Sequence, residues 1–189
     1  MERDSVVAFL RRHAPGDARE AAHVATVLGV LEAAEDPFSR ASTAVGHVTA
    51  SGFVLSPEGG RLLLILHPTL GRWLQPGGHL EAGDADIVAA ARREVCEETG
   101  LAGLRLLPGS PDLLDVDVHA IPANPRRGEG AHLHLDLRVL FQSDQDRLQP
   151  GGGVAEARWV PLADVVAQGT DASVLRAVRR IGQVARAAR

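Results

Sequence analysis

The chain of 189 residues contains one cysteine, no tyrosine and only 3% aromatic residues. A lone thiol permits no internal disulfide, and so few aromatic rings leave little on which the bases of a nucleic acid could stack. The net charge of −4 also lacks the basic excess of proteins that bind nucleic-acid polymers. We therefore expect a small phosphorylated ligand and no nucleic-acid partner.

Long hydrophobic runs are also missing from the sequence. The longest apolar stretches, such as Leu62–Leu66, have the length of a strand and fall far short of a membrane span. Charges from Glu2 onward stand where a signal sequence would be apolar. We therefore predict a cytoplasmic location and no membrane partner. The 45% hydrophobic and 23% charged residues are typical of a soluble protein with one core.

The most informative segment is Gly77–Leu101, in which a glycine pair and an acidic turn precede a predicted helix. Glu94, Glu97 and Glu98 share one face of this helix, because residues three and four apart stack on the same side. Like charges at this spacing each cost a helix about 0.2–0.5 kcal/mol. A hard divalent cation would neutralise them, and Mg²⁺ (or Mn²⁺) is the expected cofactor.

The ends of this helix are well specified. Asp84 or Asp86 can cap its start, and Gly100 suits a left-handed stop. The pair Gly77–Gly78 allows a tight backbone turn that brings a carbonyl oxygen close to an ion. Cys96 falls opposite the glutamates, so we interpret it as a structural thiol and not as a nucleophile.

These residues resemble the Nudix superfamily, whose signature runs Gly, five residues, Glu, seven residues, then Arg-Glu-apolar-any-Glu-Glu-any-Gly-apolar. Residues Arg93–Leu101 match its second half completely. In the first half, Asp84 replaces Glu after Gly78, and eight residues separate Asp84 from Arg93. We interpret this as one inserted residue, with Asp84 as a shorter carboxylate in a similar role. Two further segments resemble strands of the superfamily: Gly46–Leu55 and Arg158–Leu162.

The resemblance implies an α+β protein, an α/β/α sandwich with a mixed β-sheet between helices. It implies metal-dependent hydrolysis of a diphosphate bond in a nucleoside diphosphate linked to another group, or in a related small phosphorylated substrate. Arg93 would orient the carboxylates of the site. The implied metal ligands are Glu94, Glu97, Glu98 and the Gly77 carbonyl. Glu94 is the first candidate for the general base, and Glu129 and Glu156 are candidates outside the motif.

Two other functions are compatible with the same motif. A non-catalytic Nudix-like domain that binds a nucleotide as a sensor is favoured by Asp84 and the inserted residue, and disfavoured by the intact glutamates. A Nudix-fold isoprenoid diphosphate isomerase also uses histidines and glutamates around a metal. That enzyme requires a reactive cysteine in the pocket, and Cys96 lies on the wrong face of the helix.

The order of predicted elements divides the chain in two. Residues 1–42 form an N-terminal helical extension, and residues 43–189 form the Nudix hydrolase domain. A capping box of Asp17 and Glu20 begins the second helix of the extension. We expect the extension to cover the sheet or to make a homodimer contact. Helices are predicted over 4–13, 17–35, 162–168 and 173–188, and strands over 45–55, 61–67, 73–80, 113–121, 132–141 and 154–160.

A second polar pattern alternates with leucine and valine on two predicted strands. Its members are His132, His134, Asp136 and Arg138 on one strand and Asp115, Asp117 and His119 on the other. The solvent-facing side of an antiparallel sheet would explain such alternation. Surface strands favour Thr, Lys and Glu, however, whereas histidines with aspartates provide metal ligands and phosphate donors. We predict that His132, His134 and Asp136 line the substrate pocket, where a second metal could bind.

Local cations are expected to meet the charge of the substrate phosphates. The arginines predicted for this role are Arg72, Arg126 and Arg127. His79, next to the glycine pair, is predicted to contact the substrate as well. We expect His47 to be an ordinary satisfied polar residue, and we assign no role to His23 or His67.

Overall fold

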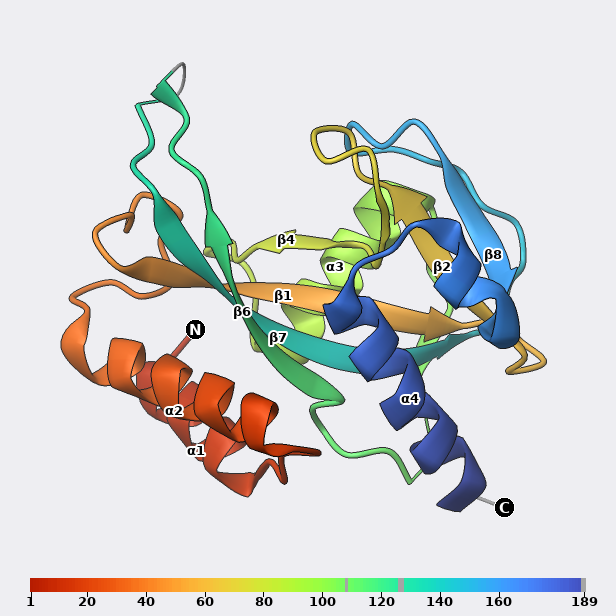
Figure 1. Ribbon diagram of the computed structural model, residues 1–189, viewed down its shortest axis with the longest axis horizontal. Coiled ribbons are helices and arrows are strands. Elements are labelled where there is room, and N and C mark those ends of the chain that lie inside the picture. Colours follow the sequence, from red (N-terminus) through yellow and green to blue (C-terminus); the bar gives the residue numbers. More distant parts are fainter. Residues whose placement is uncertain (108, 126–127, 188–189) are drawn as a thin grey trace.

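The computed structural model describes residues 1–107, 109–125 and 128–187. Within these residues, eight strands form one mixed sheet with helices on both faces (Figure 1). The elements are α1 (Arg3–Arg12), α2 (Ala18–Ala33), β1 (Gly46–Leu55), β2 (Arg61–Leu66), β3 (Trp73–Leu74), β4 (Gly77–His79), α3 (Ile87–Thr99), β5 (Leu104–Leu106), β6 (Asp115–Ile121), β7 (His132–Ser143), β8 (Ala157–Pro161), the 3₁₀ helix η2 (Leu162–Gln168) and α4 (Ala172–Ala187).

The long strands β1 and β7 form the centre of the sheet. They pair in parallel from Gly46 opposite Leu133 to Leu55 opposite Gln142. The path of neighbouring strands is β3-β2-β1-β7-β5, and the remaining strands join it as partners of β1 (β4), β7 (β6) and β2 (β8). Parallel and antiparallel pairs therefore occur in one sheet, which confirms the predicted mixed topology.

Two hydrophobic clusters bind the helices to opposite faces of the sheet. On one face, Val48 and Leu135 pack with residues of α1, α2 and α3, among them Val95. On the other face, Phe53 packs with residues of η2 and α4, among them Ile181. Figure 1 shows α3 behind the sheet and α4 in front of it. The predicted α/β/α sandwich is confirmed.

Helices α1 and α2 are tied to the sheet through a buried carboxylate. Asp17 caps α2, as predicted, by accepting a hydrogen bond from the Glu20 amide at 2.8 Å. The Glu20 side chain, only 1% exposed, accepts from the Gly16 and Val116 amides at 2.5 and 3.1 Å. The extension thus shares a core and hydrogen bonds with the sheet, and the division at residue 42 remains a prediction from the sequence.

The sequence-based strand boundaries need two corrections. The strand predicted over 73–80 is split into β3 and β4 at Gln75 and Pro76, because proline has no amide hydrogen to donate to a neighbouring strand. The carbonyl of Pro76 instead accepts from the Gly52 amide at 3.0 Å. The prediction also missed β5, which is three residues long and too short to show a period.

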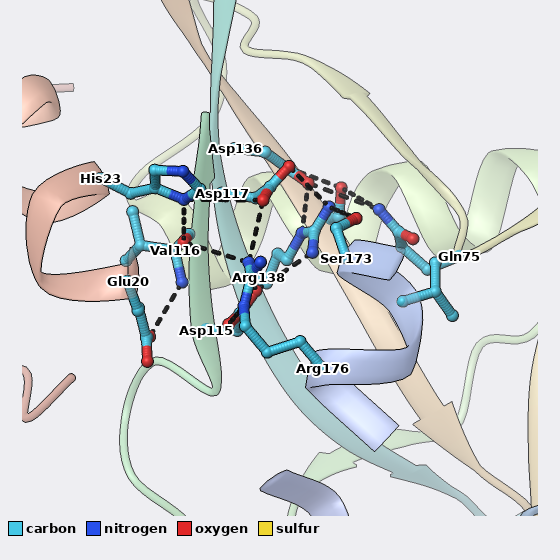
Figure 2. A network of polar contacts seen from close by, with 12 residues as sticks. Glu20, His23, Gln75, Asp115, Val116, Asp117, Asp136, Arg138, Ser173 and Arg176 are labelled. Atoms are coloured by element: carbon cyan, nitrogen blue, oxygen red, sulfur yellow. Dashed lines mark hydrogen bonds and ion pairs between the residues drawn. The ribbon is translucent and has the colours of Figure 1, made fainter. Parts of the chain in front are cut away.

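The polar faces of β6 and β7 meet in the register that their alternation predicts. Asp115 lies opposite Arg138, and Asp117 lies opposite Asp136. These side chains do not face solvent, since Asp115 is 0% and Arg138 2% exposed. The solvent-facing alternative is therefore wrong for them. Arg176 from α4 lies over the same aspartates (Figure 2).

Two guanidinium groups and three carboxylates form this buried network. Arg138 donates to Asp136 at 2.8 Å and to Asp115 at 3.0 Å. Arg176 donates to both oxygens of Asp115 at 2.8 and 2.7 Å and to Asp117 at 2.9 Å. Buried charges are tolerated only when paired and hydrogen-bonded. The network thus fixes α4 to the centre of the sheet.

Removing one carboxylate of this network should lower the free energy of unfolding. The Asp115→Ala variant leaves two buried guanidinium groups short of a partner, a change that costs about 3–5 kcal/mol in comparable ion pairs. We expect this loss in the free energy of unfolding measured in urea. Asp112→Ala is the control, because that side chain is 66% exposed and should change stability by no more than about 0.5 kcal/mol. Equal losses in the two variants would contradict the role of the network.

The network should also make stability depend on acid pH. Burial alone would raise the pKa of Asp117, but the hydrogen bond from His119 and the charges of Arg138 and Arg176 lower it below the ordinary value of 3.8. A lowered pKa contributes stability above the unfolded value and loses it as pH falls toward the folded value. Urea midpoints should therefore fall below about pH 4, and Asp117→Asn should flatten this dependence. A slope unchanged by Asp117→Asn would refute the assignment.

Candidate active site

Helix α3 holds its glutamates on a firmly anchored face. Asp86 caps the helix by accepting from the Ala89 amide at 2.7 Å, and Gly100 ends it in the left-handed conformation with φ 73°. Ala91 and Val95 are fully buried on the adjacent side of the helix. Both predicted helix signals are confirmed, with Asp86 rather than Asp84 as the cap.

Asp84 instead pairs with the arginine of the motif. Its two carboxylate oxygens accept from Arg93 Nε and Nη2 at 3.0 and 2.9 Å, a bidentate pairing that fixes the guanidinium plane. Burial would raise the pKa of Asp84, but these bonds and the charge of Arg93 lower it. The shorter carboxylate therefore reaches the motif arginine although one extra residue precedes the helix.

Arg93 connects the loop, strand β4 and helix α3. Its Nη1 donates to Glu94 at 2.9 Å and to Glu97 at 3.3 Å, and its Nη2 donates to the His79 carbonyl at 2.9 Å. The side chain is 20% exposed. Because its donors are directed to protein oxygens, Arg93 positions the other groups of the site.

Glu98 lies in a different environment from its neighbours. Its carboxylate accepts from the Gly77 amide at 3.0 Å, and within the described residues no arginine pairs with it. Burial, followed by the charges of Glu94 and Glu97, raises the pKa of Glu98 to about 7. Burial also raises the pKa of Glu94. A half-buried acidic group short of positive charge fits a divalent cation with oxygen ligands.

The glycine pair Gly77–Gly78 leaves room for the carboxylates of α3. A Cβ atom on Gly78 would lie 2.7 Å from Glu94 Oε2, closer than real Cβ contacts. A Cβ on Gly77 would lie 2.4 Å from the Ser51 hydroxyl. The missing side chain of Gly78 thus lets β4 approach Glu94, and that of Gly77 lets β4 lie close to β1. Carboxylate oxygens of this kind suit Mg²⁺ or Mn²⁺.

The structure brings three of the predicted substrate-binding residues into one group. The rings of His79, His132 and His134 lie together, with centroids of His79 and His134 at 5.2 Å and of His132 and His134 at 5.3 Å. Burial, followed by the charge of His47, lowers the pKa of His79 to about 4; burial and the neighbouring histidines lower that of His134 to about 2. The rings of His79 and His134 are therefore neutral near pH 7.

Asp136 lies beside this group but within the buried network. Its Oδ1 accepts from the Ser51 hydroxyl at 2.7 Å. Its Oδ2 accepts from Arg138 at 2.8 Å and from the Gln75 side-chain amide at 3.4 Å (Figure 2). The carboxylate is 2% exposed. The structure thus engages Asp136 with protein donors.

The described contacts of the remaining predicted site residues are with groups other than the glutamates of α3. Arg72 is exposed. Glu129 pairs with Arg40 at 3.3 Å, and Glu156 is exposed, with its carbonyl bonded to the Leu66 amide. The predictions for Arg126 and Arg127 fall outside the described residues.

Cys96 is a structural thiol, as predicted. Its sulfur donates to the Leu101 carbonyl at 2.7 Å and packs against the core under α3. Burial raises the pKa of the thiol, which makes it a poor nucleophile. This environment argues against the isomerase alternative.

Two residues of these polar groups, His47 and Arg176, were not predicted from the sequence. His47 is 1% exposed and lies 5.0 Å from His132 and 4.9 Å from His134 between ring centroids. Its Nε2 has no hydrogen-bond partner in the described part of the chain, so it is not the satisfied residue that we expected. The parallel register of β1 with β7 would have revealed it. Arg176 was missed because nothing local marks its partners.

Comparison with known proteins identifies the family. The model of the NUDIX domain matches residues 46–180. The chain belongs to the NUDIX family. A probable DHNTP pyrophosphohydrolase of Lactococcus lactis subsp. cremoris is 30% identical over 102 residues, which are 54% of this chain and 57% of that protein. The chain thus matches little more than half the length of this relative.

Solved structures confirm the NUDIX fold. A NUDIX-family hydrolase from Clostridium perfringens has a TM-score of 0.54 and 20% identity, over 72% of this chain and 97% of that one. The NUDIX domain of Shewanella oneidensis NrtR, complexed with ADP ribose, has a TM-score of 0.52 and 22% identity, over 82% and 96% of the two chains. As for the membrane, none of the described helices has the length and apolar composition needed to span it.

A methyl group on Gly78 should weaken metal binding without unfolding the protein. Gly78→Ala forces the Glu94 carboxylate to move, because that flexible group is what the new Cβ meets. We expect Mn²⁺ affinity, measured by calorimetry, to fall by about 10–100-fold, the loss typical when the support of a metal ligand is disturbed. Gly83→Ala is the matched control, since nothing lies within 4 Å of its Cβ. Equal affinities would contradict this geometry.

Proposed function

We propose that this NUDIX protein is a pyrophosphohydrolase that uses Mg²⁺ or Mn²⁺ to hydrolyse a diphosphate bond. The proposed substrate class is a nucleoside diphosphate linked to another group, or a related small phosphorylated molecule. The observation that carries the proposal is the half-buried carboxylate of Glu98, which bonds to the Gly77 amide and lies near Glu94, and with which no arginine of the described residues pairs.

The residues proposed to hold the metal are Glu94, Glu97, Glu98 and the carbonyl of Gly77. When bound, the ion would offset the charge of the phosphates and lower the pKa of a water molecule. Arg93 holds the carboxylates of Glu94 and Glu97 in place, and Asp84 holds Arg93. Catalysis of this kind depends on positioning and charge neutralisation, which a capped and buried helix can supply.

Glu94 is our candidate for the group that takes the proton from the attacking water. Its Oε1 accepts from Arg93 at 2.9 Å, and its Oε2 lies against Gly78. One oxygen is thus fixed while the other lies at the glycine pair. Glu129 and Glu156 remain candidates outside the motif, although the ion pair of Glu129 with Arg40 engages its carboxylate.

The substrate class draws on the relatives. The curated relative is named for DHNTP, and the NUDIX domain of NrtR was solved with ADP ribose; both ligands contain a phosphoanhydride bond. We propose that His79, Arg72, His132, His134 and Asp136 line the side of the site that meets the substrate. A cytoplasmic location and a homodimer contact through α1 and α2 belong to the same proposal.

Turnover should depend on the motif glutamates. A phosphate-release screen with Mg²⁺ and Mn²⁺ would cover nucleotide sugars, ADP-ribose, dinucleoside polyphosphates, oxidised nucleoside triphosphates and non-nucleotide diphosphates. We expect Glu98→Gln to reduce turnover of the best substrate to the level without enzyme, because a neutral amide cannot replace an anionic ligand. Glu32→Gln, on the exposed side of α2, is the control and should retain full activity.

Other outcomes of the screen assign the function differently. Turnover lost in Glu129→Gln or Glu156→Gln but kept in Glu94→Gln would move the base outside the motif. Saturable nucleotide binding without product would show a sensor domain. Full activity in Glu98→Gln would refute the proposed metal site.

A further inference from the structure

Five histidines from four strands converge next to β4. His47 comes from β1, His79 from β4, His119 from β6, and His132 and His134 from β7. Ring centroids of neighbouring members are 4.9–5.5 Å apart. The parallel register sets His47 directly beside His134, and the β6–β7 pairing sets His119 on its other side. We call this group the imidazole cluster.

The ring nitrogens of three members lie close to one another. One ring nitrogen each of His47, His132 and His134 lies within 4.8 Å of the others. In the described part of the chain this is the one group of three or more metal-ligating side chains so close together. Small rotations of the rings would close it around an ion bound at about 2.0–2.1 Å, the usual distance for Zn²⁺ and imidazole.

For two of the three rings, backbone carbonyls already select the tautomer that such a site requires. Nδ1 of His132 donates to the Gly130 carbonyl at 2.8 Å, and Nδ1 of His47 donates to the Ser42 carbonyl at 3.3 Å. With the proton on Nδ1, the lone pair lies on Nε2. Metal-binding histidines are commonly held in this way by a second hydrogen bond. The Nε2 atom of His47 is buried and has no partner among the described residues.

The chemistry of the cluster differs from that of the glutamates. Neutral imidazoles suit Zn²⁺, Co²⁺, Ni²⁺ and Cu²⁺, whereas Mg²⁺ prefers hard oxygen ligands. His79 joins the two sites, because its ring belongs to the cluster while its carbonyl accepts from Arg93 at 2.9 Å. His119 is 43% exposed and marks the side that opens to solvent.

We propose that His47, His132 and His134 form a second metal site, which selects a transition-metal ion such as Zn²⁺ and is separate from the carboxylate site on α3. Three protein ligands leave a further position for His79 or for a ligand from solvent. The proposal does not depend on the proposed hydrolase activity, because none of its three ligands is among the proposed metal ligands on α3 and β4, although His132 and His134 are also proposed to face the substrate.

The first test uses the whole unaltered chain, freed of metal by dialysis against a chelator. We expect it to bind one Co²⁺ with a visible absorption band, to exchange that ion for Zn²⁺, and to retain it in excess Mg²⁺. In ¹⁵N-edited imidazole spectra, Zn²⁺ should shift the Nε2 signals of three histidines and leave their protonated Nδ1 in place. No binding, displacement by Mg²⁺, or shifts confined to other histidines would overturn the proposal.

Variants then assign the ligands. His134→Gln should weaken Zn²⁺ binding by at least the ~10–100-fold loss that removal of an outer partner of a ligand causes. His119→Gln, next to the site but outside the ligand set, and Glu98→Gln, in the carboxylate site, should bind Zn²⁺ as the unaltered chain does. Loss of Zn²⁺ binding in Glu98→Gln alone would overturn the proposal.

Two further measurements decide between a metal site and the alternatives. If circular dichroism shows that His134→Gln fails to fold, the imidazole spectra of the unaltered chain decide. If inorganic pyrophosphate without metal shifts the same three rings and Zn²⁺ does not, the cluster binds phosphate and the proposal is wrong. Zn²⁺ binding in a protein without hydrolase activity would separate this inference from the proposed function.

Discussion

The parallel pairing of β1 with β7 is the constraint on which both polar regions depend. One register places His47 beside His134, Thr49 beside Asp136 and Ser51 beside Arg138. A shift by one residue would turn all of these side chains to the opposite face, where Val48 and Leu135 now fill the core. The hydrophobic face therefore enforces the alignment of the polar one.

The same strand β1 also sets the position of the glutamates. It pairs with β4, with Ser51 opposite Gly77 and Thr49 opposite His79, and Arg93 joins β4 to α3. The glycine pair, the helix and the histidines are thus held by one framework of backbone hydrogen bonds. Asp84 shows how this framework tolerates a departure from the family signature, since its carboxylate meets Arg93 across a longer loop.

Features that are local in the sequence could be predicted from it. The cap and stop of α3, the shared face of its glutamates, and the alternation along β6 and β7 depend on residues a few positions apart. The burial of the polar face could not be foreseen, because Arg176 lies 61 residues from Asp115 and on a helix whose polar side looks solvent-exposed from sequence. His47 was misjudged for a related reason: two of its ring neighbours lie on β7, more than eighty residues away.

The buried side chain of Glu20 has a consequence for how the family domain is to be understood. The sequence match to the NUDIX domain begins at residue 46. The side chain of Glu20, which lies before that point, nevertheless accepts a hydrogen bond from the Val116 amide of β6 and is hydrogen-bonded to the His13 ring. Without residues 1–42, that amide would lose its acceptor, and the apolar residues now under α1 and α2 would meet water. The boundary recognised by homology therefore cuts through shared core packing and hydrogen bonds. We expect a chain without residues 1–42 to be less stable than the whole protein.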